Sequence, residues 1–180
     1  KVSATGRTAV VTRLLALKGE EPVELDAAVP GQSVAVELDR DIDITRGDLL
    51  SAVADAPEPA NRYSADVVWL SEEPLAHGRS YILRSGPLEV PTVITAMRHQ
   101  LDVITGSELA SRSLGINDIG RVELATNNSV TLDAYTRCHD TGGFILCDRV
   151  TGETVAAGLT RYAPRRSTNV PEPSLTADRP

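Results

Sequence analysis

The sequence predicts an all-β protein. Apolar and polar residues alternate along most of the chain, and this period of two places apolar side chains on one face of a strand. Clusters of Gly and Pro, such as 55–61 (DAPEPAN), interrupt the alternation at intervals. Only residues 106–120 lack the strand pattern. Many short strands with no helices between them favour small closed barrels.

About ten segments have the strand pattern. They are residues 8–17, 33–38, 41–44, 63–70, 80–85, 91–103, 119–126, 129–138, 143–148 and 154–162. The sequence DTGGF predicts a hairpin turn after 129–138, and Thr151-Gly152 predicts a second one before 154–162. Within 106–120 we expect a helical turn from Glu108 to Leu114, capped by Ser107 and ended by Gly115.

The stretch 41–50 (DIDITRGDLL) contains the tripeptide Arg46-Gly47-Asp48, which also occurs as an adhesion signal. The alternation predicts that Ile42 and Ile44 face a barrel core while Asp41 and Asp43 face water. Gly47 then supplies a bend, after which Leu49 and Leu50 close the barrel. We therefore expect the tripeptide to be a turn at the end of a scaffold strand.

The prolines of 55–61 predict a stiff, solvated connector between two domains. This gives a first domain over residues 1–58 and a second, complete barrel over 59–164. Residues 165–180 lose the apolar periodicity and read as a linker or disordered tail that begins with Arg165-Arg166.

Composition and charge limit the function classes. The 180 residues are 41% apolar and 24% charged, which is typical of a soluble globular protein. No apolar run is long enough to cross a bilayer and no secretory signal opens the chain, so we expect a cytoplasmic protein without a membrane partner. Residues 20–58 carry eleven carboxylates and two arginines, whereas the whole chain has a net charge of −7. Such an acidic block disfavours a nucleic-acid partner.

The sequence offers no catalytic, cofactor-binding or metal site. It lacks a phosphate-loop motif and a nucleophile-elbow motif. His77, His99 and His139 have no carboxylate at metal-ligand spacing, and surface or turn positions are expected for them. We expect no disulfide, because strand register would set Cys138 opposite residue 145 instead of Cys147. Trp69, the only tryptophan, could anchor a partner surface, but we interpret it as a core residue.

Several motifs together resemble one family. GRTAVVTRLLAL (6–17) and 28–50, with its Arg-Gly-Asp turn, resemble the end of the second domain of translation-factor-type GTPases. LGINDIGRVEL (114–124) and GGFILCDRVTGETVAAG (142–158) are more specific. They resemble the third domain of the GTPase subunit of bacterial ATP sulfurylase, sulfate adenylyltransferase subunit 1. The resemblance covers residues 4–164.

The resemblance implies two translation-factor-like β-barrels, the first incomplete at its N-terminal side and completed by upstream residues. In this family GTP hydrolysis drives formation of adenosine 5′-phosphosulfate and pyrophosphate from ATP and sulfate, and adenylyl transfer occurs on a smaller partner subunit. GTP and Mg²⁺ belong to an N-terminal domain with a phosphate loop, so no cofactor residue carries over to this chain. The fragment is expected to be non-catalytic, to dock the partner subunit and to transmit the GTPase switch. RRSTNV (165–170) resembles the link to an adenylylsulfate kinase domain in bifunctional members.

Two alternatives remain open at this point. The barrels could belong to another translation-factor-type GTPase and bind tRNA or protein, which the acidic block and 114–124 disfavour. The chain could instead be an adhesion module that uses Arg46-Gly47-Asp48. Its apolar flanks, which predict a strand and not a loop tip, disfavour that reading.

Overall fold

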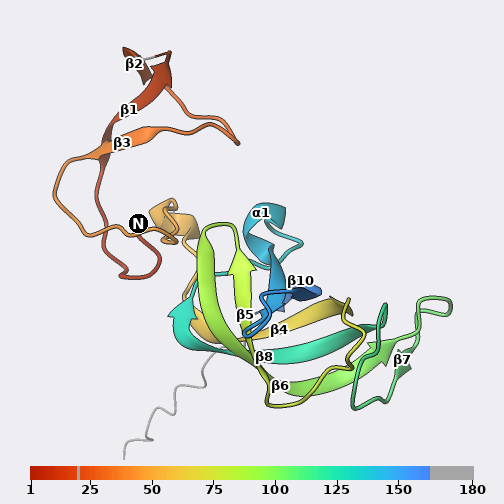
Figure 1. Cartoon of the computed structure of the whole chain (residues 1–180). Coiled ribbons are helices and arrows are strands. Elements are labelled where there is room, and N and C mark those ends of the chain that lie inside the picture. Colours follow the sequence, from red (N-terminus) through yellow and green to blue (C-terminus); the bar gives the residue numbers. More distant parts are fainter. Residues whose placement is uncertain (20, 163–180) are drawn as a thin grey trace, which may run out of the picture.

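The computed structural model describes residues 1–19 and 21–162, and it confirms an almost purely β protein (Figure 1). The ten strands of these described residues form a three-stranded sheet near the N-terminus and a larger sheet from β4 onward. No helix among the described residues is long and apolar enough to cross a membrane. The predicted tail 165–180 lies outside the described residues, and the domain boundary near residue 59 stays a prediction.

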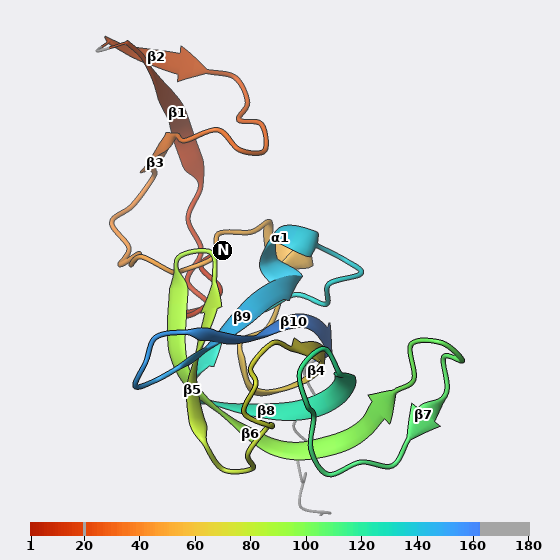
Figure 2. The ribbon, with the colours of Figure 1, turned by 45° about the vertical axis from the view of Figure 1, so that its right-hand side comes forward.

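The larger sheet closes into a six-stranded antiparallel barrel. Its strands follow the order β5-β9-β10-β4-β8-β6, and the pairing of β5 with β6 closes the ring (Figure 2). A two-residue strand, β7 (Glu108–Leu109), extends the far end of β6. The barrel strands are β4 (Ala60–Trp69), β5 (Ser80–Ser85), β6 (Leu88–Leu101), β8 (Ile119–Val130), β9 (Gly143–Asp148) and β10 (Thr154–Tyr162).

The barrel core follows from the alternation. Tyr63, Ala65, Val67 and Trp69 are successive inward positions of β4, and none is more than 2% exposed. The Tyr63 hydroxyl donates to the backbone oxygen of Val130, so its one polar atom is satisfied inside the barrel. The strands predicted at 80–85, 143–148 and 154–162 are confirmed to the residue as β5, β9 and β10.

The N-terminal sheet is small and open. It comprises β1 (Val11–Lys18), β2 (Glu21–Leu25) and β3 (Ala35–Leu38) in the order β2-β1-β3. The predicted strands 8–17 and 33–38 are confirmed in part, whereas β2 was not predicted. Leu17 is 75% exposed and Val11 is 50% exposed, so this sheet buries little of its apolar surface within the described residues.

The strand predicted at 41–44 is wrong. These residues have no strand partner among the described residues, and Ile44 is 41% exposed, although Ile42 is half-buried. The predicted turn is confirmed: the Thr45 N–H and hydroxyl both donate to the Asp48 carboxylate, and Gly47 has φ +99°. Leu50 forms only an isolated bridge to Val2 and is 44% exposed, so it does not close a barrel.

The helical turn predicted at 108–114 is also wrong. Glu108 and Leu109 instead form β7, which pairs with Gln100 and Leu101 at the end of β6. A turn at Asp102 precedes β7, and the Asp102 carboxylate accepts the backbone N–H groups of Ile104 and Thr105. Such a short helix would form few hydrogen bonds for its nucleation cost, so pairing with an existing strand is the better alternative.

The strand predicted at 129–138 and its hairpin turn are wrong. β8 runs on to Val130, and the chain then leaves the sheet and forms a four-residue helix, α1 (His139–Gly142). A Cβ atom on Gly142 would collide with the backbone of Tyr135, which explains why the turn needs this glycine. Cys138 therefore does not lie opposite residue 145, and both cysteines are free thiols.

One glycine in β10 allows an aromatic ring to fill the barrel. Gly158 lies directly opposite Phe144 of β9, and a Cβ atom there would overlap the buried Phe144 ring. We expect Gly158→Ala to destabilise the chain by about 1–3 kcal/mol, as overpacking of a core does. Urea denaturation of the two proteins measures this change.

The control for Gly158→Ala is the same substitution in a Phe144→Leu background. The smaller side chain leaves space for the new methyl group, so the cost of Gly158→Ala should shrink there. An equal cost in both backgrounds would show that the ring contact is not the cause.

Candidate functional site

Three loops gather at one end of the barrel. They are residues 70–79 between β4 and β5, residues 102–118 around β7, and the β9–β10 turn at 149–153. Backbone hydrogen bonds join them to the barrel and to each other: the Leu70 N–H donates to Val155 (2.8 Å), and the Leu75 N–H donates to Leu114 (2.9 Å). Loops on a rigid scaffold are common sites of binding function.

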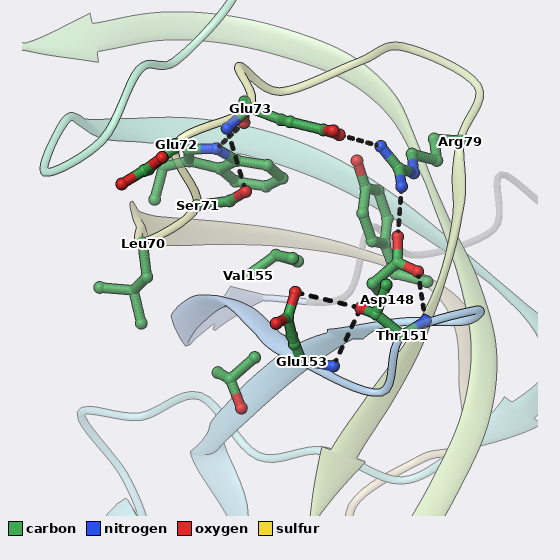
Figure 3. Close-up of a pocket in the computed structure, with 12 residues that line it drawn as sticks. Leu70, Ser71, Glu72, Glu73, Arg79, Asp148, Thr151, Glu153 and Val155 are labelled. Atoms are coloured by element: carbon green, nitrogen blue, oxygen red, sulfur yellow. Dashed lines mark hydrogen bonds and ion pairs between the residues drawn. The ribbon is translucent and has the colours of Figure 1, made fainter.

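A pocket of about 510 Å³ lies between the β4–β5 loop and the β9–β10 turn. Figure 3 shows Glu72 and Glu73 on the loop side and Thr151 and Glu153 on the turn side. Its lining comprises Trp69, Leu70, Ser71, Glu72, Glu73, Arg79, Tyr81, Asp148, Thr151, Glu153, Thr154 and Val155.

Two buried aromatic side chains form the inner wall. Trp69 and Tyr81 are 2% and 1% exposed, and their rings meet edge to face with centroids 5.9 Å apart. The Trp69 indole N–H donates to the backbone oxygen of Glu73 (2.8 Å), which anchors the loop over the barrel end. Trp69 is thus confirmed as a core residue, and it also borders the pocket.

Arg79 joins the two sides of the pocket. Its guanidinium contacts the Glu73 carboxylate at 2.8 Å and the Asp148 carboxylate at 2.6 Å (Figure 3). Asp148 is only 5% exposed and also accepts the backbone N–H groups of Val150 and Thr151. The N–H groups of Thr151 and Val150, together with Arg79, hold the pKa of Asp148 below its ordinary value of 3.8. Asp148 therefore keeps its charge and orders the turn.

The pocket has more negative than positive charge. Among the described residues that line it, Arg79 is the one cationic side chain, against the carboxylates of Glu72, Glu73, Asp148 and Glu153. Two of these carboxylates already bind Arg79. Glu72 and Glu153 have no cationic partner among residues 1–19 and 21–162, and Glu153 accepts only a 3.3 Å hydrogen bond from the Thr151 hydroxyl. The arrangement suits binding of a positively charged group.

The three histidines remain apart from the pocket and from one another. His77 forms a 2.7 Å hydrogen bond with the backbone oxygen of Arg112, and the exposed His139 stacks on Tyr135. His99 differs from the expected surface position: it lies on β6, is half-buried, and contacts Glu108 at 3.3 Å. Within the described part of the chain, no three His, Cys, Asp or Glu side chains converge as metal ligands.

The sequence reasoning missed this pocket. Its members come from 69–81 and 148–155, which only barrel closure brings together. Two local signals pointed toward it: Glu72-Glu73 directly after a buried strand, and Asp148 at the start of a glycine-containing turn.

Asp148 should contribute stability that acid removes. Because its pKa is lower in the folded protein, the contribution is complete above the ordinary value of 3.8 and is lost as the pH falls through the lower folded value. We expect Asp148→Asn to be less stable than the original chain at pH 7, and the difference to narrow below pH 3.8. Urea denaturation of both proteins across this pH range measures it, with Glu58→Gln in the exposed connector as the control. A difference that stays constant with pH would contradict the assignment.

Solved structures with the same fold are translation-factor-like. The structure of Sup35 complexed with GDP matches 91% of this chain with a TM-score of 0.78 at 20% sequence identity. The match covers 40% of the Sup35 chain. Sup35 complexed with GMPPNP matches 89% of this chain with a TM-score of 0.75. At this identity the likeness concerns the fold, and it confirms the predicted translation-factor-like barrel fold; the described residues hold one closed barrel, and the first predicted barrel is present only as the open sheet β2-β1-β3.

Curated relatives match the chain at higher identity. The bifunctional enzyme NodQ of Azospirillum brasilense is 40% identical over 92% of this chain, and sulfate adenylyltransferase subunit 1 of Vibrio cholerae is 39% identical over 89% of it. The NodQ of Rhizobium sp. (strain N33) is 33% identical over 97%. The chain spans about a quarter to a third of the length of these relatives. The resemblance inferred from 114–124 and 142–158 is confirmed.

A family model described as "GTP-eEF1A C-terminal domain-like" matches residues 62–161. This range begins inside β4 and ends inside β10, so it contains nearly all of the barrel and every residue of the pocket. Because the match covers more than half of the sequence, the chain belongs to the GTP-eEF1A C-terminal domain-like family.

Proposed function

We propose that this chain is the barrel portion of the GTPase subunit of a cytoplasmic sulfate adenylyltransferase, where it docks the smaller subunit that transfers the adenylyl group. The observation that carries this proposal is the 39% identity to sulfate adenylyltransferase subunit 1 over 89% of the chain. The name of that relative implies a further subunit. The parent protein would couple GTP hydrolysis to formation of adenosine 5′-phosphosulfate and pyrophosphate from ATP and sulfate.

The closed barrel suits a docking and transmitting role. Its loop end carries the pocket. Near the other end, Arg137 binds Asp55 of the short connector helix η1 (Val53–Asp55). The Arg137 guanidinium contacts the Asp55 carboxylate and donates a 3.0 Å hydrogen bond to the Asp55 backbone oxygen. A rigid body held at both ends can convert the ordering and release of GTPase switch loops into a rotation. We propose that the barrel transmits the switch in this way.

The proposed GTP and Mg²⁺ do not fit the residues of this chain. Its sequence lacks a phosphate-loop motif, and the described residues bring no three candidate ligands together for a metal. The nucleotide is therefore proposed for a part of the parent protein outside these residues.

Binding of the smaller subunit tests the proposal directly. We expect the 180-residue chain to bind the adenylyl-transferring subunit from the same organism in calorimetric titrations, with a dissociation constant of roughly micromolar or tighter. Titrations at two temperatures prevent a small enthalpy from hiding the binding, because burial of apolar surface changes the enthalpy with temperature.

An unrelated protein of similar net charge is the control for nonspecific attraction in this titration. If the smaller subunit gives no more heat than the control at both temperatures, docking by this chain is wrong.

Hydrogen exchange of the parent protein with GTP and then GDP tests the transmitting role, because exchange in the connector 53–59 should differ between the two nucleotides.

A further inference from the structure

The outer surface of the barrel carries a group of polar side chains where β10, β4 and β8 lie side by side. Because Tyr63 and Ala65 of β4 face the core, the alternation of the strand turns Ser64 and Asp66 outward. Strand register places Arg121 of β8 directly opposite Asp66. Six residues make up this surface, which we call the outer stripe: Arg62, Ser64, Asp66, Arg121, Arg161 and Tyr162. None of them lines the pocket at the loop end.

Asp66 orients two guanidinium groups at once. Its carboxylate contacts Nε of Arg121 at 2.8 Å and Nε of Arg161 at 3.3 Å, so one negative charge serves two positive charges. Arg62 is exposed on the same face of β4 and forms no ion pair within residues 1–19 and 21–162. Arginines that a carboxylate already holds lose less side-chain freedom when a ligand binds, which favours recognition at this surface.

The carboxylates beside the outer stripe do not cancel its charge. Glu123 contacts the Arg98 guanidinium at 3.2 Å, and Glu108 contacts the His99 ring at 3.3 Å. With these neighbours included, four arginines face three carboxylates, so the surface keeps a surplus of one positive charge. The chain as a whole has a net charge of −7. A locally positive surface on an acidic protein is complementary to an anionic group.

Ser64 is a second, independent indication of a ligand. It lies on the outward face of β4, yet it is 0% exposed, and its hydroxyl oxygen has no hydrogen-bond partner. Strand register places Tyr162 directly opposite it on one side and Glu123 on the other. A buried hydroxyl without a partner costs free energy, so a ligand that brings an acceptor oxygen to it gains affinity.

These features together select one class of occupant. A carboxylate supplies negative charge for the arginines and an acceptor oxygen for the Ser64 hydroxyl. Leu159 lies directly opposite Asp66 on the same face and is 44% exposed, so the ligand also meets apolar surface there. Arginine, tyrosine and apolar side chains together are typical of contacts with another protein. The carboxylates of Asp66, Glu123 and the acidic chain as a whole disfavour a nucleic acid.

We propose that the outer stripe binds an aspartate or glutamate side chain of a partner polypeptide. Ser64 lies between Arg62 and Asp66 on one face of β4, so a carboxylate above it pairs with Arg62 and with Arg161. The exposed Tyr162 side chain turns aside, and the Ser64 hydroxyl donates to the carboxylate. The inference rests on the proposed function in one respect, namely that the barrel docks another polypeptide. It adds the place of contact and the chemistry of the residue that enters.

A pair of matched peptides tests the proposal without the smaller subunit. We expect acetyl-Leu-Glu-Leu-amide to shift the backbone amide resonances of residues 62–66 and 159–162 in ¹⁵N-labelled protein, in a saturable manner that added salt weakens. The peptide acetyl-Leu-Gln-Leu-amide should leave them in place. Equal shifts with both peptides, or none with either, would overturn the proposal.

Two further titrations test other occupants of the outer stripe. Inorganic phosphate at the same concentration should shift the resonances less than the glutamate peptide does, and an equal shift would show a general anion site and overturn the assignment to a polypeptide. Dilution of the chain alone should leave the resonances unchanged. If they move with protein concentration, the outer stripe contacts a second copy of the chain and the proposal is wrong.

Variants assign the contacts. Arg62→Gln and Arg161→Gln should each weaken binding of the glutamate peptide by about 1.4- to 5-fold, since an exposed ion pair contributes about 0.2–1 kcal/mol. Ser64→Ala should also weaken it without loss of stability in urea, because the hydroxyl has no partner in the free protein. Arg149→Gln removes the same charge from the exposed β9–β10 turn and should have no effect. Unchanged affinity in the first three variants would overturn the assignment.

The double variant Arg62→Gln/Arg161→Gln separates this inference from the proposed function. If the smaller subunit binds the double variant and the original chain equally well, the outer stripe is not the contact and the docking proposal stands. If the subunit does not bind the original chain, the docking proposal is wrong, and the peptide titration still judges the outer stripe. Weaker binding of the subunit to the double variant, with normal binding to Arg149→Gln, supports both.

Discussion

Closure of the barrel by the pairing of β5 with β6 is the constraint on which the rest of the structure depends. It joins Ser80–Ser85 to residues 88–93, so each of the six strands is paired with a neighbour on both sides. Closure also directs alternate side chains into one shared core, where Tyr63, Trp69 and Tyr81 are buried. The connections must then leave at the two ends, and this collects three loops at one end, two of which line the pocket.

The N-terminal sheet shows what happens without closure. In the described part of the chain β2 and β3 are the outer strands of an open sheet, and its central strand β1, which contains Val11 and Leu17, follows the apolar pattern that predicted a strand. Leu17 and Val11 nevertheless remain largely exposed, because no second layer covers them there. Alternation makes a segment suitable for a strand, but burial requires a partner surface from elsewhere.

The loop end of the barrel combines order with exposure. Asp102 and Asp148 each accept two backbone N–H groups and so fix their turns, and Ile104 and Val150 are more than 90% exposed on those turns. Ordered turns lose little conformational entropy when a partner binds, which favours recognition there. The acidic pocket lies beside the turn at Asp148.

The sequence by itself determined the all-β class, the family resemblance, the burial of Trp69, and the exact bounds of β5 and β9, because the pleat of a strand is a local property with a period of two. The tertiary structure alone decided that 41–44 is not a strand, that Glu108–Leu109 is one, and that the pocket residues meet. Strand formation and pocket geometry depend on hydrogen-bond partners and neighbours that are distant in the chain, and no local pattern encodes them.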